Sequence, residues 1–437
     1  MKIAYITAGA GNMICGNCLR DNNLARALLD LGHDVQLIPT YTPIRTDEVD
    51  VSLQRVFMGG INVYLQQKSA LFRNTPQFVD DLLDNPTLLR WVSQFAVKTQ
   101  PQDLAELTVS VLKGSEGSQK KELTKLIAWL KELKPEVVHL TNSMLAGIAP
   151  EVKRELGCPV VCSLQGEDLF LSNLPSPHRE EAFAVLRGMV RHVDTFIAPS
   201  RDHAQAMAPL LGIEASQVRV VMPGLHLEDF RQRSAGNPQE FVIGYLARIA
   251  PEKGLHLLVE AVHILQSRRK PGDPRCRLRV AGWLGDEARQ YLDTVQALAQ
   301  AKGLAEDFEY LGTIGREQKL AFLQTLDVLS VPVSYRAPKG AYVLEALACG
   351  VPVVQPRIGV FPELIEATGG GLLFEPGNAQ DLALALESLL ADRAASHEKG
   401  MQGRKGVHKN FHSRRTAQET VAVYEQITSK QAQSYGV

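Results

Sequence analysis

The chain lacks any uninterrupted run of about 18 apolar residues, the length that a membrane-spanning helix needs, so we expect no segment to cross a bilayer. Its first residues, MKIAYITAGAG, contain too short an apolar stretch for a signal peptide and continue directly into a strand–loop–helix pattern. The sequence therefore predicts a cytoplasmic protein.

The chain also lacks an excess of charge of either sign. It carries 47 Lys and Arg against 48 Asp and Glu, a formal net charge of -1. This balance gives no global reason to expect nucleic acid, and we predict no nucleic-acid partner, although local basic faces leave room for peripheral contact with a membrane. A hydrophobic content of 45% is that of an ordinary globular protein, and 437 residues fit two domains of about 200 residues each.

Cysteine is scarce, with six residues in no regular framework. Cys15 and Cys18 form a C-x-x-C, but no second pair stands at a zinc-binding spacing, so a metal or redox role for them is only the alternative interpretation. We expect Cys158, Cys162 and Cys349 to be buried as small apolar residues. No Asp-x-Asp pair follows a strand in the expected site, and we predict no metal site and no cofactor.

Short β-branched runs alternate with helical patterns in two series, as is typical of parallel strands buried on both faces. The sequence predicts an α/β protein with two doubly wound, Rossmann-like domains that face each other across a cleft. The first series of expected strands is Ile3–Thr7, Val35–Pro39, Val137–Leu140, Val160–Leu164, Thr195–Ala198 and Val218–Met222; the second is Phe241–Ala247, Leu278–Ala281, Phe308–Leu311, Val328–Val331 and Val351–Gln355.

A polar segment with glycine and proline, Pro223–Glu240, separates the two series and has the composition of a linker. We therefore expect a first domain over residues 1–222 and a second over residues 223–412, with residues 413–437 forming a last helix. A helical insertion at about 50–125, with helical patches at 78–83 and 88–97, interrupts the first domain.

The segment 242–254, VIGYLARIAPEKG, predicts a strand, a turn and a helix, with Arg248 and Lys253 in the turn. Helix amide groups and the helix dipole attract an anion, and basic side chains neutralise the rest of its charge. A cation near the positive end of a helix dipole is unfavourable unless an anion lies between them. We therefore predict a diphosphate site and assign Arg248 and Lys253 as catalytic groups that stabilise a leaving diphosphate. The alternative is that both are solvated surface charges.

The segment 340–354, GAYVLEALACGVPVV, predicts a helix opened by Gly340, Ala341 and Tyr342, whose amides would face the diphosphate. Glu345 is an acid among apolar neighbours, which is unfavourable to bury unless it accepts strong hydrogen bonds. Ribose hydroxyls of a nucleotide would supply them. Glu363, in the next loop, is either a further substrate contact or a helix cap.

In the first domain a glycine turn follows the first strand, and we predict that Gly11 and Gly16 let a ligand approach the backbone. Gln165 and Glu167 follow a strand at the expected cleft, where Gln165 is predicted as a catalytic sugar contact and Glu167 as a substrate contact. His139 is interpreted as a strand-end histidine with its hydrogen bonds satisfied. Asp21 is expected on the surface of a helix.

The order of GYLARIAPEKG, the LEALACGVPVV helix and GVFPE resembles the retaining glycosyltransferases of the GT-B fold, specifically glycosyltransferase family four (glycosyl transferases group one). The resemblance covers nearly the whole chain. It implies a metal-independent hexosyltransferase of carbohydrate biosynthesis whose second domain binds a nucleotide-diphosphate sugar donor, with the ribose on Glu345. The first domain would bind a small-molecule, lipid-linked or glycan acceptor, and the last helix would cross back to that domain.

The chain departs from the family pattern at two positions. The family typically has two glutamates separated by seven residues; Glu345 matches the second, but the first falls on Ala337. Gln165 stands where the family commonly has a histidine. These departures keep open a nucleotide-sugar-binding protein with little or no transferase activity. Another GT-B activity, such as an epimerase or a phosphorylase, is the third hypothesis.

Overall fold

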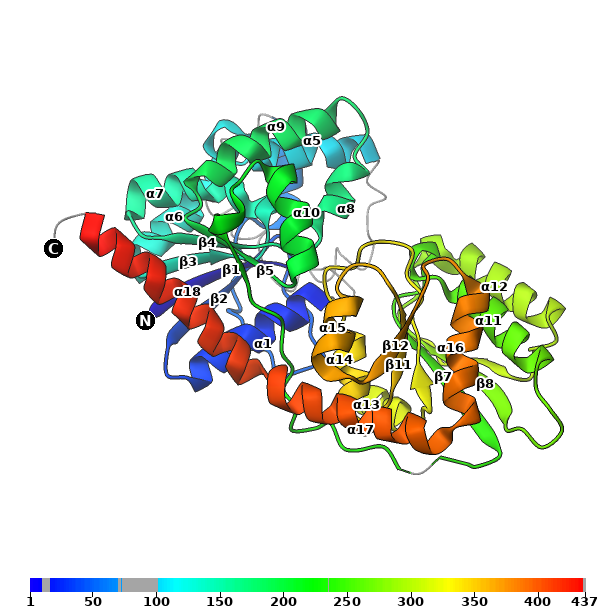
Figure 1. Ribbon diagram of the computed structural model, residues 1–437. Helices are drawn as coiled ribbons and strands as arrows, with labels where there is room; N and C mark the ends of the chain where they lie inside the picture. The colour runs from blue at the N-terminus through cyan, green and yellow to red at the C-terminus, as the bar shows by residue number, and fades with distance from the viewer. Residues whose placement is uncertain (10–15, 70–71, 73–100, 235, 435–437) are drawn as a thin grey trace. The chain divides into compact units, whose positions relative to one another are not determined.

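The computed structural model describes residues 1–9, 16–69, 72, 101–234 and 236–434 (Figure 1). The chain forms two compact units, which we call unit 1 (Met1–Met222 with Ser413–Val437) and unit 2 (Pro223–His412). The helical patches expected at 78–83 and 88–97 lie outside the described residues. None of the helices in the described ranges combines the length and apolar character that crossing a membrane requires.

Unit 1 is built on a six-stranded parallel sheet in the order β2-β1-β3-β4-β5-β6. All six strands expected in the first series are present. Their bounds are β1 Lys2–Ala8, β2 Asp34–Thr40, β3 Val137–Leu140, β4 Val160–Ser163, β5 Thr195–Ala198 and β6 Val218–Val220.

Helices cover both faces of this sheet. The α-helices in the described part of unit 1 are α1 Gly16–Asp30, α2 Gly60–Lys68, α5 Pro101–Leu112, α6 Lys120–Leu133, α7 Ala149–Leu156, α8 Glu167–Ser172, α9 His178–Met189, α10 Arg201–Leu211 and α18 Ser413–Ser434. Short 3-10 turns are η2 Gly114–Glu116, η3 Ser143–Ile148, η4 Val190–His192 and η5 Ala215–Gln217.

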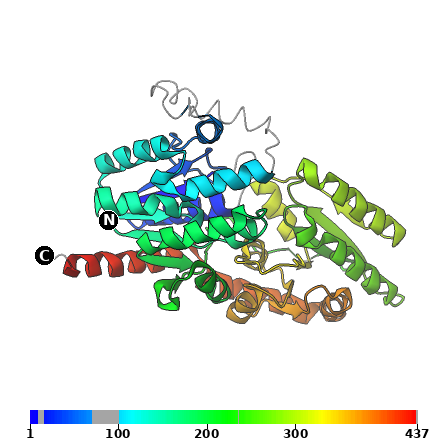
Figure 2. The same ribbon diagram turned by 90° about the horizontal axis from the view of Figure 1, so that it is seen from above.

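The alternation of side chains along β1 divides the hydrophobic core of unit 1 into two layers, because successive strand residues point to opposite faces. Ile3 and Tyr5 pack with α1 and α18 in one layer, while Ala4 and Ile6 pack with the helices between α5 and α10 in the other. Figure 1 shows α18 running along α1, and the view from above shows the cyan and green helices lying over the blue strands (Figure 2). A sheet covered on both faces explains why its strands read as continuous apolar runs.

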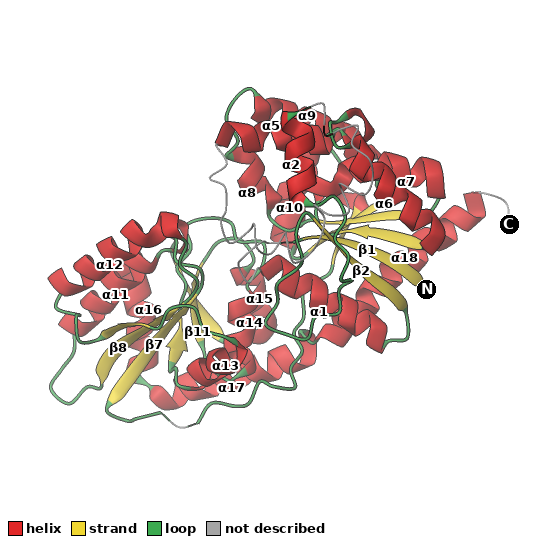
Figure 3. Ribbon diagram, turned by 180° about the vertical axis from the view of Figure 1, so that it is seen from behind, coloured by secondary structure: helices red, strands yellow, loops and turns green. Residues whose placement is uncertain are grey.

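Unit 2 contains a second parallel sheet in the order β12-β11-β10-β7-β8-β9, and Figure 3 shows its strands between helices. The strand bounds are β7 Glu240–Leu246, β8 Arg275–Ala281, β9 Phe308–Tyr310, β10 Val328–Leu329, β11 Val353–Pro356 and β12 Gly371–Phe374. Read from β9 to β12, this is the strand order of a dinucleotide-binding Rossmann domain. The sequence patterns did not predict β12, which forms the edge of the sheet.

Two groups of helices accompany this sheet: α11 packs beside α12 and α16, whereas α17 packs on α14 and α15. Their bounds are α11 Leu255–Ser267, α12 Arg289–Ala301, α13 Arg316–Gln324, α14 Ala341–Ala348, α15 Phe361–Thr368, α16 Ala379–Ala391 and α17 Arg393–Asn410, with 3-10 turns η6 Pro251–Lys253 and η7 Asp286–Ala288.

Glycines on one side of α17 allow it to lie directly against neighbouring backbone. A Cβ atom on Gly403 would lie 2.8 Å from the Cα of Gly370 and 2.6 Å from the side chain of Leu347. Gly400 would meet the carbonyl oxygen of Gly350 at 2.2 Å. The close approach of α17 to the turns after α14 and α15 therefore depends on the absence of side chains at these positions.

We predict that Gly403→Ala lowers the free energy of unfolding by about 1–3 kcal/mol, because the added methyl group overpacks the contact with Gly370. Gly188→Ala in α9 is the matched control, since Gly188 is exposed and a Cβ atom there meets nothing within 4 Å. It should raise the free energy of unfolding by up to about 1 kcal/mol through helix propensity. Urea unfolding followed by circular dichroism measures both, and equal effects of the two substitutions would contradict the packing argument.

Candidate functional site

The carboxyl ends of the strands in unit 2 form a natural ligand-binding edge. In an open α/β sheet, ligands bind outside these ends at the point where the strand order reverses. Here the reversal lies between β7 and β10, which are neighbours in the sheet although far apart in sequence. The segments that follow them, 247–254 and 330–340, carry most of the residues predicted for the diphosphate site.

These two segments are locked together. Gly254 has a φ of +73°, and a Cβ atom on it would lie 2.0 Å from the carbonyl oxygen of Pro332. The amide of Ser334 donates a hydrogen bond to the carbonyl oxygen of Glu252 at 3.0 Å. Only glycine fits position 254, so the turn that carries Arg248 and Lys253 is held against the loop after β10.

The two predicted cations lie in the same turn and have different surroundings. The Lys253 ammonium donates to the Tyr335 hydroxyl at 2.5 Å and lies 4.9 Å from the centroid of that ring. Arg248 is exposed and forms an ion pair with Glu252, four residues later. Tyr335 thus holds the side chain of Lys253 in place, whereas the charge of Arg248 is partly neutralised by Glu252.

Phenol groups gather beside this turn. The phenol groups of Tyr245 and Tyr335 each interact electrostatically with the phenol group of Tyr342. The Tyr342 hydroxyl is buried and has no hydrogen-bond partner within the described part of the chain. Burial raises the pKa of Tyr342 well above its usual value, so its phenol stays neutral and remains a hydrogen-bond donor. A buried donor without a partner at this edge suits a ligand that brings an acceptor oxygen.

Helix α14 begins at the same edge. Gly340 precedes its first residue, and a Cβ atom there would lie 2.7 Å from the side chain of Leu364. Ala341 and Tyr342 occupy the first turn, where the amides have no acceptor within their own helix. Glu363 lies in the first turn of the next helix, α15. Helix α14 therefore begins where the loop after β10 ends, and that loop contacts the turn with Arg248 and Lys253.

Glu345 is buried, with 6% of its surface exposed, as expected for an acid among apolar neighbours. Its partner in the structure is Lys319 of α13, whose ammonium lies 2.7 Å from the carboxylate oxygen Oε1. Lys319 is itself only 9% exposed. The sequence motifs did not predict this lysine, although it stands three and four residues before the buried Phe322 and Leu323, on the inward side of the helix.

Ala337, at the position of the missing family glutamate, lies in a closed contact and is 2% exposed. Its carbonyl oxygen accepts a hydrogen bond from the amide of Val360 at 3.0 Å. Gly359 has a φ of +61°, and a Cβ atom there would come within 2.6 Å of the same oxygen. The loop after β10 therefore packs against the turn after β11. The small side chain of Ala337 fits into this close contact.

In unit 1, Asp21 is the centre of a buried polar network, so the expectation that it lies on a helix surface is wrong. Its side chain is fully buried, because α1 turns this face toward the carboxyl ends of β1 and β3. Its carboxylate accepts hydrogen bonds from Tyr5 (2.6 Å), Thr7 (2.6 Å), Arg20 (3.0 Å), Gln165 (3.1 Å) and Thr141. Five donors offset the loss of solvation that burial of this charge entails.

The predicted site residues of unit 1 that follow β4 are engaged with this network. Gln165 is 5% exposed, and its amide nitrogen donates to Asp21 and to both oxygens of Thr141. The Glu167 carboxylate accepts hydrogen bonds from the backbone N–H of Gln165 at 2.6 Å and from the backbone N–H and the hydroxyl of Ser143. Gly16 begins α1, and Gly11 lies outside the described residues.

His139 has a hydrogen-bond partner at each ring nitrogen, as predicted from its place at a strand end. One ring nitrogen lies 2.6 Å from the hydroxyl of Tyr424 on α18, and the other lies 2.8 Å from the hydroxyl of Ser163. The ring also stacks on Tyr5 at a centroid distance of 4.4 Å. Burial and the nearby charge of Arg20 lower the pKa of His139 well below its usual value, so the ring is neutral.

The cysteines expected in the core are there. Cys158, Cys162 and Cys349 are buried free thiols, and burial raises the pKa of each, to about 11 for Cys158. Cys18 is also buried, while Cys15 lies outside the described residues. Among the residues that the structure describes, no cluster of three or more His, Cys, Asp or Glu could hold a metal ion.

Two Rossmann-like units in one chain, the second with its switch point between β7 and β10, form a fold of the GT-B class. Residues 227–406 match the family model described as glycosyl transferases group 1, and residues 21–224 match the glycosyl transferase 4-like domain. Together the two models span most of the chain. The chain belongs to this glycosyltransferase family, and the resemblance inferred from its motifs is confirmed.

Individual proteins show the same likeness. D-inositol 3-phosphate glycosyltransferase of Rhodococcus erythropolis is 30% identical over 210 residues, which are 46% of this chain and 47% of that protein. The chain thus aligns with about half the length of this relative. Sucrose-phosphate synthase from Thermosynechococcus elongatus has a similar fold, with a TM-score of 0.71 at 18% identity, covering 98% of this chain and 99% of that one. Anabaena HepE, solved in complex with UDP, gives 0.68 at 17% identity, covering 98% and 100%.

We predict that Asp21→Asn lowers the free energy of unfolding by about 3–5 kcal/mol, because it leaves the largely buried Arg20 without its counter-charge. The control is Asp30→Asn in the same helix, where the side chain is exposed and the change should stay within about 0.5 kcal/mol. Chemical unfolding of the full chain measures both variants. Equal stability of the two would show that the network around Asp21 contributes nothing.

Proposed function

We propose that this protein is a retaining glycosyltransferase that moves a hexosyl group from a nucleotide-diphosphate sugar to a hydroxyl acceptor. The observation that carries the proposal is the close contact between two segments of unit 2, which joins the turn with Lys253 to the loop that leads into α14. Family membership supports glycosyl transfer as the reaction. Solved proteins of similar fold include one bound to UDP, so a uridine diphosphate sugar is the first donor to test.

On the donor side, Lys253 and Arg248 neutralise the diphosphate, and the amides of Ala341 and Tyr342 add the attraction of a helix start. Arg248 must exchange Glu252 for the phosphate when the donor binds. Glu345 accepts the ribose hydroxyls with the carboxylate that Lys319 holds in position. Glu363 adds a contact from the start of α15.

The chemistry is a same-face displacement. The bond between the anomeric carbon and the diphosphate oxygen breaks, and the acceptor oxygen forms its bond to that carbon on the same face. The acceptor proton passes to the departing diphosphate, whose developing negative charge Lys253 and Arg248 stabilise. Since these two side chains supply the positive charge, the proposed reaction does not require a metal ion.

Unit 1 supplies the acceptor contacts in this proposal. Gln165, as the catalytic sugar contact, and Glu167, as a substrate contact, follow β4 at the carboxyl ends of the strands. Gly11 and Gly16, the first residue of α1, are proposed as further substrate contacts. The acceptor is a small molecule, a lipid-linked sugar or a glycan. D-inositol 3-phosphate, named for the relative from Rhodococcus, is a first small-molecule acceptor to assay.

A second candidate function is nucleotide-sugar binding with little or no transfer. Two observations favour it: Ala337 lies in a closed contact where the family has a glutamate, and the amide nitrogen of Gln165 is engaged with Asp21 and Thr141. Turnover of a donor separates the two functions, because a binding protein releases the nucleotide sugar unchanged.

We predict that Lys253→Ala weakens UDP binding about ten- to a hundredfold, since a charge-assisted contact contributes about 1.5–3 kcal/mol. Lys270→Ala, at an exposed lysine of the same unit, should leave the affinity unchanged. Isothermal titration calorimetry with EDTA present measures both affinities. The same experiment shows whether UDP binding requires a metal ion. If UDP binds both variants equally well, Lys253 is not part of the diphosphate site.

We predict that Ala337→Glu raises kcat on a uridine diphosphate hexose about tenfold or more, while the Kd of UDP stays within about threefold. A carboxylate at this position would stabilise positive charge on the sugar in the transition state without touching the nucleotide. Ala337→Gln is the control, because it adds the same volume without the charge. Since position 337 is buried, thermal unfolding of both variants is recorded alongside.

The wild-type rate decides how this result is understood. A slow wild type accelerated by Glu but not by Gln supports the assigned role of position 337. A fast wild type slowed by both substitutions would mean that another group performs that role. UDP binding without turnover of any donor, in either form, would favour the binding protein over the transferase.

A further inference from the structure

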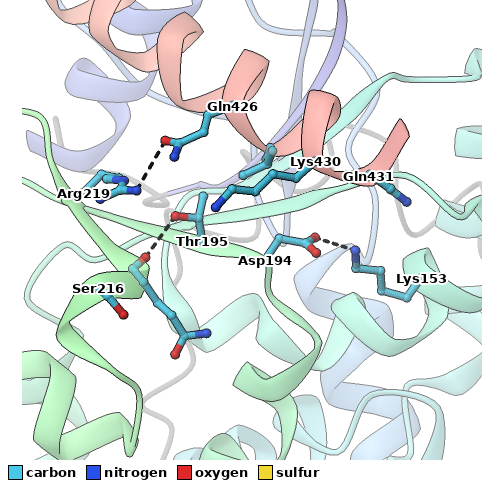
Figure 4. A pocket seen from close by; sticks show the side chains of 10 residues that line it. Lys153, Asp194, Thr195, Ser216, Arg219, Gln426, Lys430 and Gln431 are labelled. Carbon is cyan, nitrogen blue, oxygen red and sulfur yellow. Dashed lines mark hydrogen bonds and ion pairs between the residues drawn. The ribbon is translucent and has the colours of Figure 1, made fainter. Parts of the chain in front are cut away.

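Unit 1 has a cavity at the amino-terminal ends of its strands, whereas Asp21 and Gln165 lie at the carboxyl ends. It occupies about 610 Å³ where the amino-terminal ends of β5 and β6 meet the later part of α18 (Figure 4). Thr195 begins β5, so the cavity lies one strand length away from the carboxyl edge, about 13 Å for four residues. Lys153, Asp194, Thr195, Ser216, Gln217, Arg219, Gln426, Ile427, Lys430 and Gln431 line it.

One carboxylate in the lining is already neutralised. Asp194 forms an ion pair with Lys153 at 2.5 Å, and the same oxygen accepts the amide of Val160 at 2.7 Å. This arrangement ties the start of β5 to the end of α7 and leaves Asp194 with little capacity to neutralise a further cation.

Two cations in the lining remain without an acid. The Arg219 guanidinium makes a long contact of 3.4 Å with the amide oxygen of Gln426. The Lys430 ammonium forms no hydrogen bond or ion pair with any residue in the described ranges, and it extends from α18 into the cavity beside Thr195 (Figure 4). Arg219 comes from an edge strand and Lys430 from the last helix, so two distant parts of the sequence bring positive charge to one cavity.

The rest of the lining is suited to hydroxyl groups. Ser216, Gln217, Gln426 and Gln431 carry hydroxyl or amide groups, and Ile427 is the one aliphatic side chain in the lining. No aromatic ring lines the cavity, so nothing there would stack on a nucleobase. A phosphate paired with two cations, on a body rich in hydroxyls, matches both the charge and the hydrogen-bonding groups.

We propose that this cavity binds a phosphomonoester of a sugar or another polyol, with its phosphate between Arg219 and Lys430. A phosphomonoester carries about -1.5 to -2 charges near pH 7, which matches the two cations that have no acidic partner in the lining. The site is separate from the proposed donor site and does not depend on the transferase proposal. Because Arg219 lies on the edge strand β6 and Lys430 on α18, a bound phosphate contacts both elements and stabilises the packing of α18 against β6.

The test is calorimetric titration of the full chain with glucose 6-phosphate, inorganic phosphate and glucose in turn. We expect glucose 6-phosphate to bind most tightly, inorganic phosphate about tenfold more weakly, and glucose not measurably. Vesicles of phosphatidylcholine with about one tenth phosphatidylinositol phosphate distinguish a lipid headgroup from a free sugar phosphate. Binding to the vesicles but not to glucose 6-phosphate would assign the phosphomonoester to a membrane lipid.

Arg219→Glu and Lys430→Glu should each weaken glucose 6-phosphate binding at least tenfold, the effect of one lost charge-assisted contact. Arg414→Glu is the matched control, because it reverses an exposed charge on the same helix, about 24 Å along its axis from Lys430. Lys253→Ala should not alter this binding, and Lys430→Glu should not alter UDP binding. Both substituted side chains are exposed, so the variants are expected to fold, and circular dichroism verifies this.

Two results would overturn the proposal. One is the absence of binding by glucose 6-phosphate, inorganic phosphate and the vesicles. The other is glucose 6-phosphate binding that survives both charge reversals, which would place the ligand at another site, such as the acceptor site. In either case a failure here leaves the proposed donor site unaffected, because UDP binding is measured independently.

Discussion

A buried carboxylate must receive hydrogen bonds or a counter-charge, and both units are arranged around that requirement. In unit 1 the carboxylate of Asp21 collects donors from β1, α1, the segment after β3 and the segment after β4. In unit 2 Glu345 depends on Lys319, which α13 carries inward. Each acid draws together elements that meet at the carboxyl edge of a sheet. These contacts connect the elements at the two edges where the sequence motifs place ligands.

The strands were predictable because the signal for them is local. A parallel strand buried on both faces leaves a run of β-branched and aliphatic residues, and Val137–Leu140 or Thr195–Ala198 needs no partner to be recognised. The edge strand β12, GLLF, was missed because it begins with glycine and contains no β-branched residue. Its place in the sheet comes from pairing with β11 rather than from its own composition.

Only part of the site could be predicted from the sequence. Contacts between residues close together in the chain were predictable, and contacts between residues far apart in the chain were not. Arg248 and Lys253 occupy a turn of a few residues, so their proximity follows from local geometry. The pairing of Glu345 with Lys319 joins residues 26 apart on two helices, and the donors to Asp21 reach as far as Gln165, 144 positions away. A helix-surface pattern could not show that α1 turns Asp21 inward, because the groups that satisfy it are contributed by other elements.

The hydrogen bond between His139 and Tyr424 has a consequence for synthesis of the chain. Unit 1 is discontinuous: its sheet is made of residues before 223, but α18 follows residues 223–412. A ribosome adding about 5–20 residues per second needs roughly ten to forty seconds to pass through that stretch. During this interval the apolar layer that α18 covers, including Tyr5 and Ile197, is without its helix. The nascent first unit is thus a candidate for chaperone binding until the last helix emerges.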